Sequence, residues 1–214
     1  GDGFLTKSIL ERRLKQLWVF EIDTQWAEHV KKTYPDKRLS IFTENILDVD
    51  FTRFTQDAPW TILANLPYQI SFPFLYLLAR QKHLIKEGVV MIQEEVAQKI
   101  VKISGRGYGF PALFLQYHFA LRLLDKVPPG AFYPPPKVVS RLVYFKPIEV
   151  TPIKQEPEFW VFIKRCFLQP RRTLKNNLQS FHYDLNKISD DILQLRAQQL
   201  SMAQLLKLWD SFSD

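Results

Sequence analysis

Short apolar runs alternate with a helical pattern in the first part of the chain, and this alternation constrains the fold more than any other feature of the sequence. Runs of strand length occupy residues 17–22, 39–42 and 60–66. Between the first two, residues 26–33 show the apolar spacing of a helix, which Pro35 brings to an end. Strands that alternate with helices are typical of a parallel sheet with crossover helices. The sequence therefore predicts an α/β fold.

The pattern continues and then changes at a proline-dense loop. We predict a helix, a strand and a further helix at residues 73–80, 88–93 and 94–103, and then two strands at residues 121–127 and 141–145. The last two strands flank the proline-dense loop and alternate apolar with polar residues. We therefore expect an antiparallel hairpin that closes a mostly parallel sheet.

A helical pattern follows Pro147. We predict helices at residues 159–168, 171–181, 189–196 and 202–212. The sequence thus predicts two domains, an α/β domain at residues 1–147 and a small helical domain at residues 148–214.

The composition indicates a soluble protein with a polyanionic partner. The chain has 29 Lys and Arg residues against 22 Asp and Glu residues, a formal charge of +7. Cations that neutralise phosphates gain affinity by releasing counterions, although basic charge alone is common. We find no apolar run of about 18 residues and no leader peptide, so we expect no membrane association. The single cysteine, Cys166, fits an ordinary half-buried thiol in a reducing compartment, and we expect a cytoplasmic protein.

Glycines and strand-end polar residues at the start of the chain are typical of a nucleotide-type cofactor site. Gly1 and Gly3 would let the backbone approach a ligand before a helix, and an ordinary turn is the alternative. Such a turn normally follows a strand, so we expect further residues upstream of Gly1. Glu21, at the end of a strand, is placed to bind ribose hydroxyls, and a solvated structural acid is the alternative. After the next strand, Asn45 is a candidate to read a cofactor adenine.

The tetrapeptide at residues 65–68, Asn-Leu-Pro-Tyr, directly follows an apolar strand. An exocyclic adenine amine is a poor nucleophile because its lone pair is delocalised into the ring. The oxygen of Asn65 and a backbone carbonyl held rigid by Pro67 can accept hydrogen bonds from the N6 hydrogens and direct the lone pair toward a methyl donor. Tyr68 offers an aromatic face for a flipped or unpaired base. The alternative is a strand-to-turn break with a buried tyrosine.

Two later segments carry candidate contacts to a base and to phosphates. In the proline-dense loop, Phe132 is a candidate second wall of a base pocket and Lys137 a phosphate contact, while a rigid connector is the alternative. Five basic residues without an acid lie further on: Lys164, Arg165, Arg171, Arg172 and Lys175. Such a cluster can follow an RNA backbone, and a solvated helix face is the alternative. Lys99, Lys102 and Arg106 would extend this basic surface.

The order and spacing of these motifs resemble one family over nearly the whole chain, the KsgA/Dim1 ribosomal RNA adenine dimethyltransferases. The motifs are the tetrapeptide 65–68, the aromatic and proline-rich loop with Phe132, and the segment 167–178 with its paired arginines. The resemblance implies a seven-stranded, Rossmann-like methyltransferase domain and a small helical rRNA-binding domain. It also implies that two adjacent adenosines near the 3′ end of small-subunit rRNA are dimethylated on N6 during ribosome biogenesis, at the expense of four S-adenosylmethionine molecules.

The resemblance also implies the site residues. We expect S-adenosylmethionine to be bound by Gly1, Gly3, Glu21, Ile22, Asn45, Ile46 and Asn65, and the target base by Asn65, Leu66, Pro67, Tyr68 and Phe132. The family usually has an aspartate where Asn45 stands, and its first strand has no counterpart in this sequence, so a protein truly lacking that strand would bind cofactor poorly. We expect a monomer that needs no metal and whose partner is small-subunit rRNA or an immature small ribosomal subunit.

Three other interpretations stay open at this point. The first is a resistance-type methyltransferase of large-subunit rRNA, which shares the tetrapeptide. The triple-proline loop and Arg171-Arg172 fit the small-subunit enzymes better. The second is an rRNA-binding assembly or transcription factor that keeps the fold without catalysis. A nicotinamide-dependent Rossmann enzyme would leave the tetrapeptide and the proline loop without a role.

Overall fold

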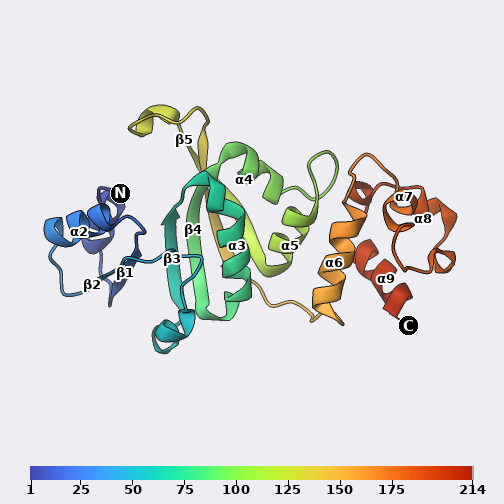
Figure 1. Ribbon diagram of the computed structural model, residues 1–214, viewed down its shortest axis with the longest axis horizontal. Coiled ribbons are helices and arrows are strands. Elements are labelled where there is room, and N and C mark those ends of the chain that lie inside the picture. Colours follow the sequence, from blue (N-terminus) through green and yellow to red (C-terminus); the bar gives the residue numbers. More distant parts are fainter. Residues whose placement is uncertain (214) are drawn as a thin grey trace. The chain divides into compact units, whose positions relative to one another are not determined.

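The computed structural model describes residues 1–213, and the chain forms two compact units, Gly1–Gln56 and the residues from Asp57 onward. The first unit is a parallel pair of strands with two helices (Figure 1). β1 (Leu17–Phe20) and β2 (Leu39–Phe42) run in the same direction, and α1 (Phe4–Leu10) and α2 (Thr24–Thr33) precede them in turn. A 3-10 segment, η1 (Phe51–Asp57), follows β2.

Local chemistry explains the start of α2 and the packing of this sheet. The Asp23 carboxylate caps the helix by accepting hydrogen bonds from the backbone N–H groups of Gln25 at 2.8 Å and Trp26 at 3.3 Å. The Phe20 and Phe42 rings stack with their centroids 5.2 Å apart, because the two residues pair across the parallel strands.

The second unit is built on a mixed four-stranded sheet in the order β3-β4-β6-β5. Its strands are β3 (Trp60–Asn65), β4 (Ile85–Gln93), β5 (Phe119–Val127) and β6 (Ser140–Pro147). β3 and β4 are parallel, whereas β6 is antiparallel to both β4 and β5. The predicted α/β fold with an antiparallel closing hairpin is confirmed. The described residues form two sheets with six strands rather than one mostly parallel seven-stranded sheet, and two of the four strand pairings are parallel.

Helices cover this sheet and then continue into a helical segment. The helices are α3 (Ser71–Arg80), α4 (Glu94–Ile100), α5 (Phe110–His118), α6 (Glu156–Cys166), α7 (Leu174–Leu178), α8 (Asp190–Leu193) and α9 (Met202–Ser213). Short 3-10 turns lie between the strands and helices of this unit: η2 (Tyr68–Ile70), η3 (Lys82–Leu84), η4 (Pro129–Ala131), η5 (Leu185–Lys187) and η6 (Ala197–Gln199). In Figure 1, α5 lies between the sheet and α6, and it contacts both β5 and α6.

One buried hydrophobic cluster joins α5 to the helical segment. Tyr108, Ala112 and Leu113 pack in the same cluster as Phe159 and Phe162 of α6. The predicted domain boundary at residue 147 stays a prediction. The buried cluster runs from α5 across this position, and the division into two compact units falls after Gln56. No helix in residues 1–213 is long and apolar enough to cross a membrane.

Several sequence predictions differ from the structure, and one of them is the helix expected at residues 189–196, which is only Asp190–Leu193. No prediction covers α5, because its run is apolar on nearly every side and lacks a one-sided periodicity. The helix expected at residues 171–181 is only Leu174–Leu178, since Thr173 caps it by accepting the Asn176 N–H, so Arg171 and Arg172 lie in the turn before it. Cys166 is fully buried rather than half-buried, and burial raises the pKa of its thiol.

Candidate active site

In the first unit, the carboxyl ends of β1 and β2 bring Glu21 beside the residues that follow β2. Because the strands are parallel, both end at the same edge, and the Glu21 N–H donates to the Phe42 carbonyl at 3.0 Å. The Glu21 carboxylate accepts a hydrogen bond from the Asp23 N–H at 3.1 Å and lies beside the backbone of Gly1. The structure thus brings together Gly1 and Glu21, two of the residues expected to bind cofactor.

Gly3 has a conformational reason to be glycine that the sequence did not reveal. Its φ is 83°, and a Cβ at this position would lie 2.5 Å from the ring of Tyr34. Packing against Tyr34 alone therefore explains the residue. The ordinary-turn interpretation of Gly3 remains open beside the cofactor interpretation.

Asn45 is held by its neighbours in a defined orientation. Its amide oxygen accepts the Leu47 N–H at 3.2 Å, and its amide nitrogen donates to Asp48 at 2.7 Å. The oxygen keeps a second lone pair, so it can still accept from an adenine amine. Ile22 is exposed and Ile46 is half-buried. A carboxylate, an amide and two apolar side chains along one sheet edge fit the ribose and adenine of a nucleoside cofactor.

In the second unit, the tetrapeptide lies where β3 ends. Asn65 is the last residue of β3 and pairs with Met91 of β4. Its side chain is exposed, and no other residue of the described chain hydrogen-bonds to it. Pro67 has φ of −54°, which fixes the chain direction before the turn η2. The Asn65 amide is therefore available to a ligand at the carboxyl end of a parallel strand.

Tyr68 is held at both its backbone and its side chain. The Ser71 hydroxyl donates to the Tyr68 carbonyl at 2.9 Å. The phenol of Tyr68 shares a hydrogen bond of 2.7 Å with the hydroxyl of Ser140, the first residue of β6. Ser140 is fully buried, and sequence reasoning missed it because a serine that opens an apolar strand gives no local signal.

The proline-dense loop leads into β6, so it ends at the same end of the sheet as the tetrapeptide. Phe132 is half-buried, while Lys137 is exposed. The base of the loop is anchored, because the Glu94 N–H donates to the Val139 carbonyl at 2.9 Å. The structure gives no contact between Phe132 and Asn65, so the expected two-walled base pocket stays a prediction.

The turn before α7 presents Arg171 and Arg172 to solvent, and buried Asn177 holds it in place. The Asn177 amide donates to the carbonyls of Cys166 at 2.8 Å and Gln169 at 3.1 Å, and its oxygen accepts the Gln169 N–H at 3.2 Å. The paired arginines thus lie on a turn whose backbone is pinned to the core. Lys175, in the first turn of α7, is also exposed.

The other two predicted RNA-binding residues already have partners. Arg165 donates to the Tyr183 hydroxyl at 2.9 Å, and its guanidinium lies 4.4 Å from the centre of the Phe181 ring. The Lys164 amine lies 4.8 Å from the centre of the Phe110 ring. Arg165 therefore packs within the helical segment and Lys164 packs against α5, and both also add positive charge.

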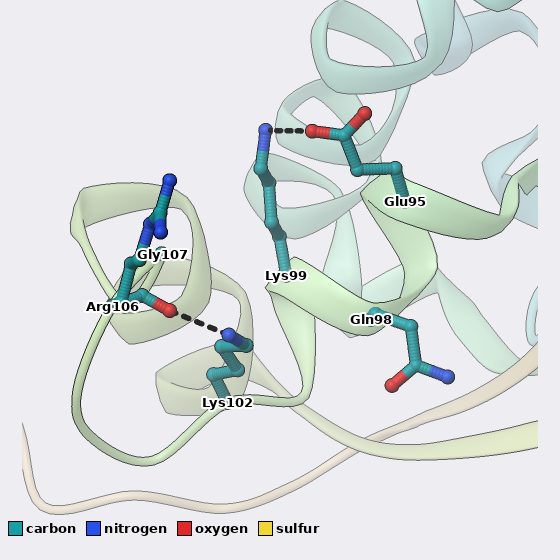
Figure 2. Close-up of a pocket in the computed structure, with 6 residues that line it drawn as sticks. All are labelled: Glu95, Gln98, Lys99, Lys102, Arg106 and Gly107. Carbon is teal, nitrogen blue, oxygen red and sulfur yellow. Dashed lines mark hydrogen bonds and ion pairs between the residues drawn. The ribbon is translucent and has the colours of Figure 1, made fainter.

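A further basic surface lies between α4 and the glycine-rich loop at residues 105–109 that follows it. An open pocket of about 290 Å³ lies here. Among its lining residues, Figure 2 shows Glu95, Gln98 and Lys99 on α4, and Lys102 and Arg106 after the helix. Lys99 pairs with Glu95 at 2.8 Å, and Lys102 donates to the Arg106 carbonyl. This pocket carries a net positive charge. Residues 1–213 contain no cluster of three His, Cys, Asp or Glu side chains that could hold a metal ion.

Comparison with known proteins decides the family. The family described as ribosomal RNA adenine dimethylase matches residues 1–214. The chain belongs to this family. It is a family of S-adenosylmethionine-dependent methyltransferases, as the sequence motifs indicated.

Two named relatives agree with this assignment. The chain is 33% identical over 210 residues to ribosomal RNA small subunit methyltransferase A of Chlorobaculum tepidum, covering 98% of this chain and 75% of the relative. It is 37% identical over 211 residues to the same-named protein of Nitrosomonas europaea, covering 95% and 79%.

The solved structures support the fold. A dimethyladenosine transferase from Plasmodium falciparum matches with a TM-score of 0.82 and 24% identity, covering 100% of this chain and 87% of the other. The 23S rRNA methyltransferase ErmE matches with a TM-score of 0.72 and 17% identity, covering 100% and 88%. At these identities the likeness establishes the fold alone, which is that of a Rossmann-like methyltransferase.

Proposed function

We propose that the protein transfers methyl groups from S-adenosylmethionine to N6 of two adjacent adenosines near the 3′ end of small-subunit rRNA, giving dimethyladenosine. The observation that carries this proposal is the free, exposed amide of Asn65 at the end of β3, three positions before the buttressed ring of Tyr68. The names of the relatives, small subunit methyltransferases A, favour the small-subunit substrate over the large-subunit one.

The tetrapeptide prepares the adenine amine for attack. The Asn65 oxygen and the Leu66 carbonyl accept hydrogen bonds from the two N6 hydrogens, which favours a pyramidal nitrogen with a localised lone pair. Pro67 limits the backbone freedom of this acceptor pair. Tyr68 stacks on one face of the base, and Phe132 closes the other.

The cofactor would supply a methyl group on a positively charged sulfur. The residues that would hold it in the first unit are Gly1, Gly3, Glu21, Ile22, Asn45 and Ile46, with Glu21 accepting from the ribose hydroxyls. That Asn65 also contacts the cofactor stays a sequence prediction. No strong general base is required, because the N6 amine becomes acidic once it carries the new methyl group.

Basic side chains would hold the RNA. Arg171, Arg172 and Lys175 are exposed near the pinned turn, and Lys137 is exposed on the proline loop. Lys164 and Arg165 add positive charge on α6. Phosphate contacts of this kind give affinity that falls with salt. We further propose that the protein acts as a monomer in the cytoplasm, on rRNA within an immature small ribosomal subunit.

Transfer of tritium from labelled S-adenosylmethionine tests the function. The purified protein is incubated separately with unmethylated small subunits, with large subunits and with free rRNA, and the product nucleosides are identified. Dimethyladenosine near the small-subunit 3′ end is the expected result. Label in large subunits alone would favour the resistance-type alternative, and tight rRNA binding without transfer would favour the assembly-factor alternative.

A further inference from the structure

The Tyr68 phenol and the Ser140 hydroxyl are joined although they lie 72 positions apart in sequence. Their oxygens are 2.7 Å apart, the usual distance of a hydrogen bond between two hydroxyl groups. Ser140 has no exposed surface. The bond as a whole is part-buried, since Tyr68 is only half-buried, but its Ser140 end is shielded from water, so losing the bond would leave a buried hydroxyl without a partner.

The sheet places this bond close to Asn65. Asn65 pairs with Met91 of β4, and Gln93 of β4 pairs with Ser140 of β6. Asn65 and Ser140 therefore lie on either side of β4 near the same end of the sheet. Two strand spacings separate them, about 10 Å. The phenol of Tyr68 thus reaches from the tetrapeptide across the end of β4 to β6.

Ser140 is itself fixed by its neighbours on both sides. The Val139 carbonyl accepts the Glu94 N–H at 2.9 Å, and the Arg141 guanidinium binds the Glu94 carboxylate at 2.6 and 2.9 Å. Ser140 also closes the proline-dense loop that carries Phe132. One hydroxyl therefore connects the Tyr68 ring to the point where the Phe132 loop enters the sheet.

We propose that Ser140 is a positioning residue for methyl transfer, which holds the Tyr68 ring in the plane needed to stack on the target adenine. This inference rests on the proposed function, since it gives Tyr68 its role against the base. Without the Ser140 hydroxyl, the ring keeps its place in the chain but samples other tilts. The target base is then bound with its N6 less often aligned, so turnover falls while RNA affinity, which comes from phosphate contacts, is kept.

A double-mutant cycle tests this inference with Ser140→Ala, Tyr68→Phe and the double variant. Each single substitution is expected to lower kcat about tenfold, as the loss of one positioning hydrogen bond would, and to leave the KM for rRNA within about twofold. The double variant should lose no more than either single variant, because both remove the same bond. Losses that multiply to about a hundredfold, or an unchanged kcat in Ser140→Ala, would overturn the inference.

A matched control shows whether the coupling is specific. Tyr144, also on β6, donates its hydroxyl to Glu87 at 2.9 Å and has no contact with Tyr68 among the described residues. Tyr144→Phe combined with Ser140→Ala should give independent effects. If this pair couples as strongly as the Tyr68 pair, Ser140 acts on the sheet as a whole and the inference fails.

A readout without turnover separates this inference from the proposed function. With 2-aminopurine at the target adenosine of an rRNA hairpin, stacking on Tyr68 should quench fluorescence, and Ser140→Ala should reduce the quench to the level of Tyr68→Phe. A full quench in Ser140→Ala would contradict the positioning role even if the wild type is active. Neither quench nor methyl transfer in the wild type would instead refute the proposed function, and this inference with it.

Discussion

The carboxylate of Glu94, at the start of α4, accepts two hydrogen bonds from the guanidinium of Arg141 on β6, at 2.6 Å from Nε and 2.9 Å from Nη2. The same guanidinium donates to the Leu124 carbonyl on β5 at 2.6 Å. This pair ties a helix to two strands directly beside Ser140. The Arg141 hydrogen bonds lower the pKa of the Glu94 carboxyl to about 2.

Glu94→Gln should remove part of the acid sensitivity of the fold. Because the folded pKa lies below the ordinary value of 4.5, the pair stabilises the protein above that value and loses its effect as the pH falls toward 2. At pH 7 the variant should melt roughly 5 °C lower, as the loss of a charge-assisted pair predicts. Thermal unfolding at pH 7, 4 and 3 measures both effects. Glu95→Gln, at an exposed neighbour paired with Lys99, is the control and should change little.

Asn65→Ala should reduce methyl transfer by about 10²–10³-fold or more, because the variant cannot accept a hydrogen bond from N6. RNA binding should stay within a few-fold, since Asn65 holds no phosphate. Single-turnover transfer and RNA titration measure the two quantities. Gln69→Ala, at the next exposed amide in the chain, should behave as wild type. Full turnover in Asn65→Ala would contradict the mechanism.

Arg171→Ala and Arg172→Ala should each weaken RNA binding and make it less dependent on salt. Removing one phosphate-binding cation should reduce the slope of log K against log salt by about one. Binding titrations at several salt concentrations give this slope. Lys207→Ala, an exposed cation on α9, is the control. An unchanged slope in both arginine variants would place the RNA elsewhere on the protein.

Asn177→Ala should destabilise the helical segment by about 1–3 kcal/mol, because two backbone carbonyls and one N–H lose a buried partner. It should also weaken RNA binding through the loosened turn that carries Arg171 and Arg172. Asn176→Ala, at the exposed neighbour, should cost less than about 0.5 kcal/mol. Denaturant unfolding measures the free energy of unfolding of both variants. Equal losses would show that the hydrogen bonds of Asn177 to the turn do not stabilise the helical segment.

His118 should make the protein less stable in mild acid. Burial, with a smaller contribution from Lys82 and opposed by Glu156, lowers the pKa of this histidine from 6.5 to about 4. The unfolded chain therefore takes up a proton first as the pH falls. Stability should drop as the pH falls from 6.5 to about 4.

Two variants check the assignment to His118. His118→Phe keeps an aromatic ring among Phe114, Tyr117 and Trp160 and should lose this part of the pH dependence. His182→Gln, at an exposed histidine, should keep it. If the stability of His118→Phe follows the wild-type pH curve, another group carries the effect.

The sequence by itself determined the features that depend on near neighbours. The strand at residues 39–42 was predicted with its observed bounds, because its apolar run has the length of a strand and is bounded by polar residues. The tetrapeptide was placed at the end of a strand for the same reason, and its chemistry depends on side chains that are adjacent in the chain. The family followed from the order of such local motifs.

Only the tertiary structure decided which distant groups meet. The Tyr68–Ser140 bond, the Glu94–Arg141 pair and the Asn177 contacts join residues whose spacing in sequence carries no signal. α5 was missed because a helix buried on nearly all sides has no polar face to reveal its period. Local patterns report backbone preference, whereas hydrogen bonds between elements depend on sheet order and register, which are fixed only when the whole unit packs.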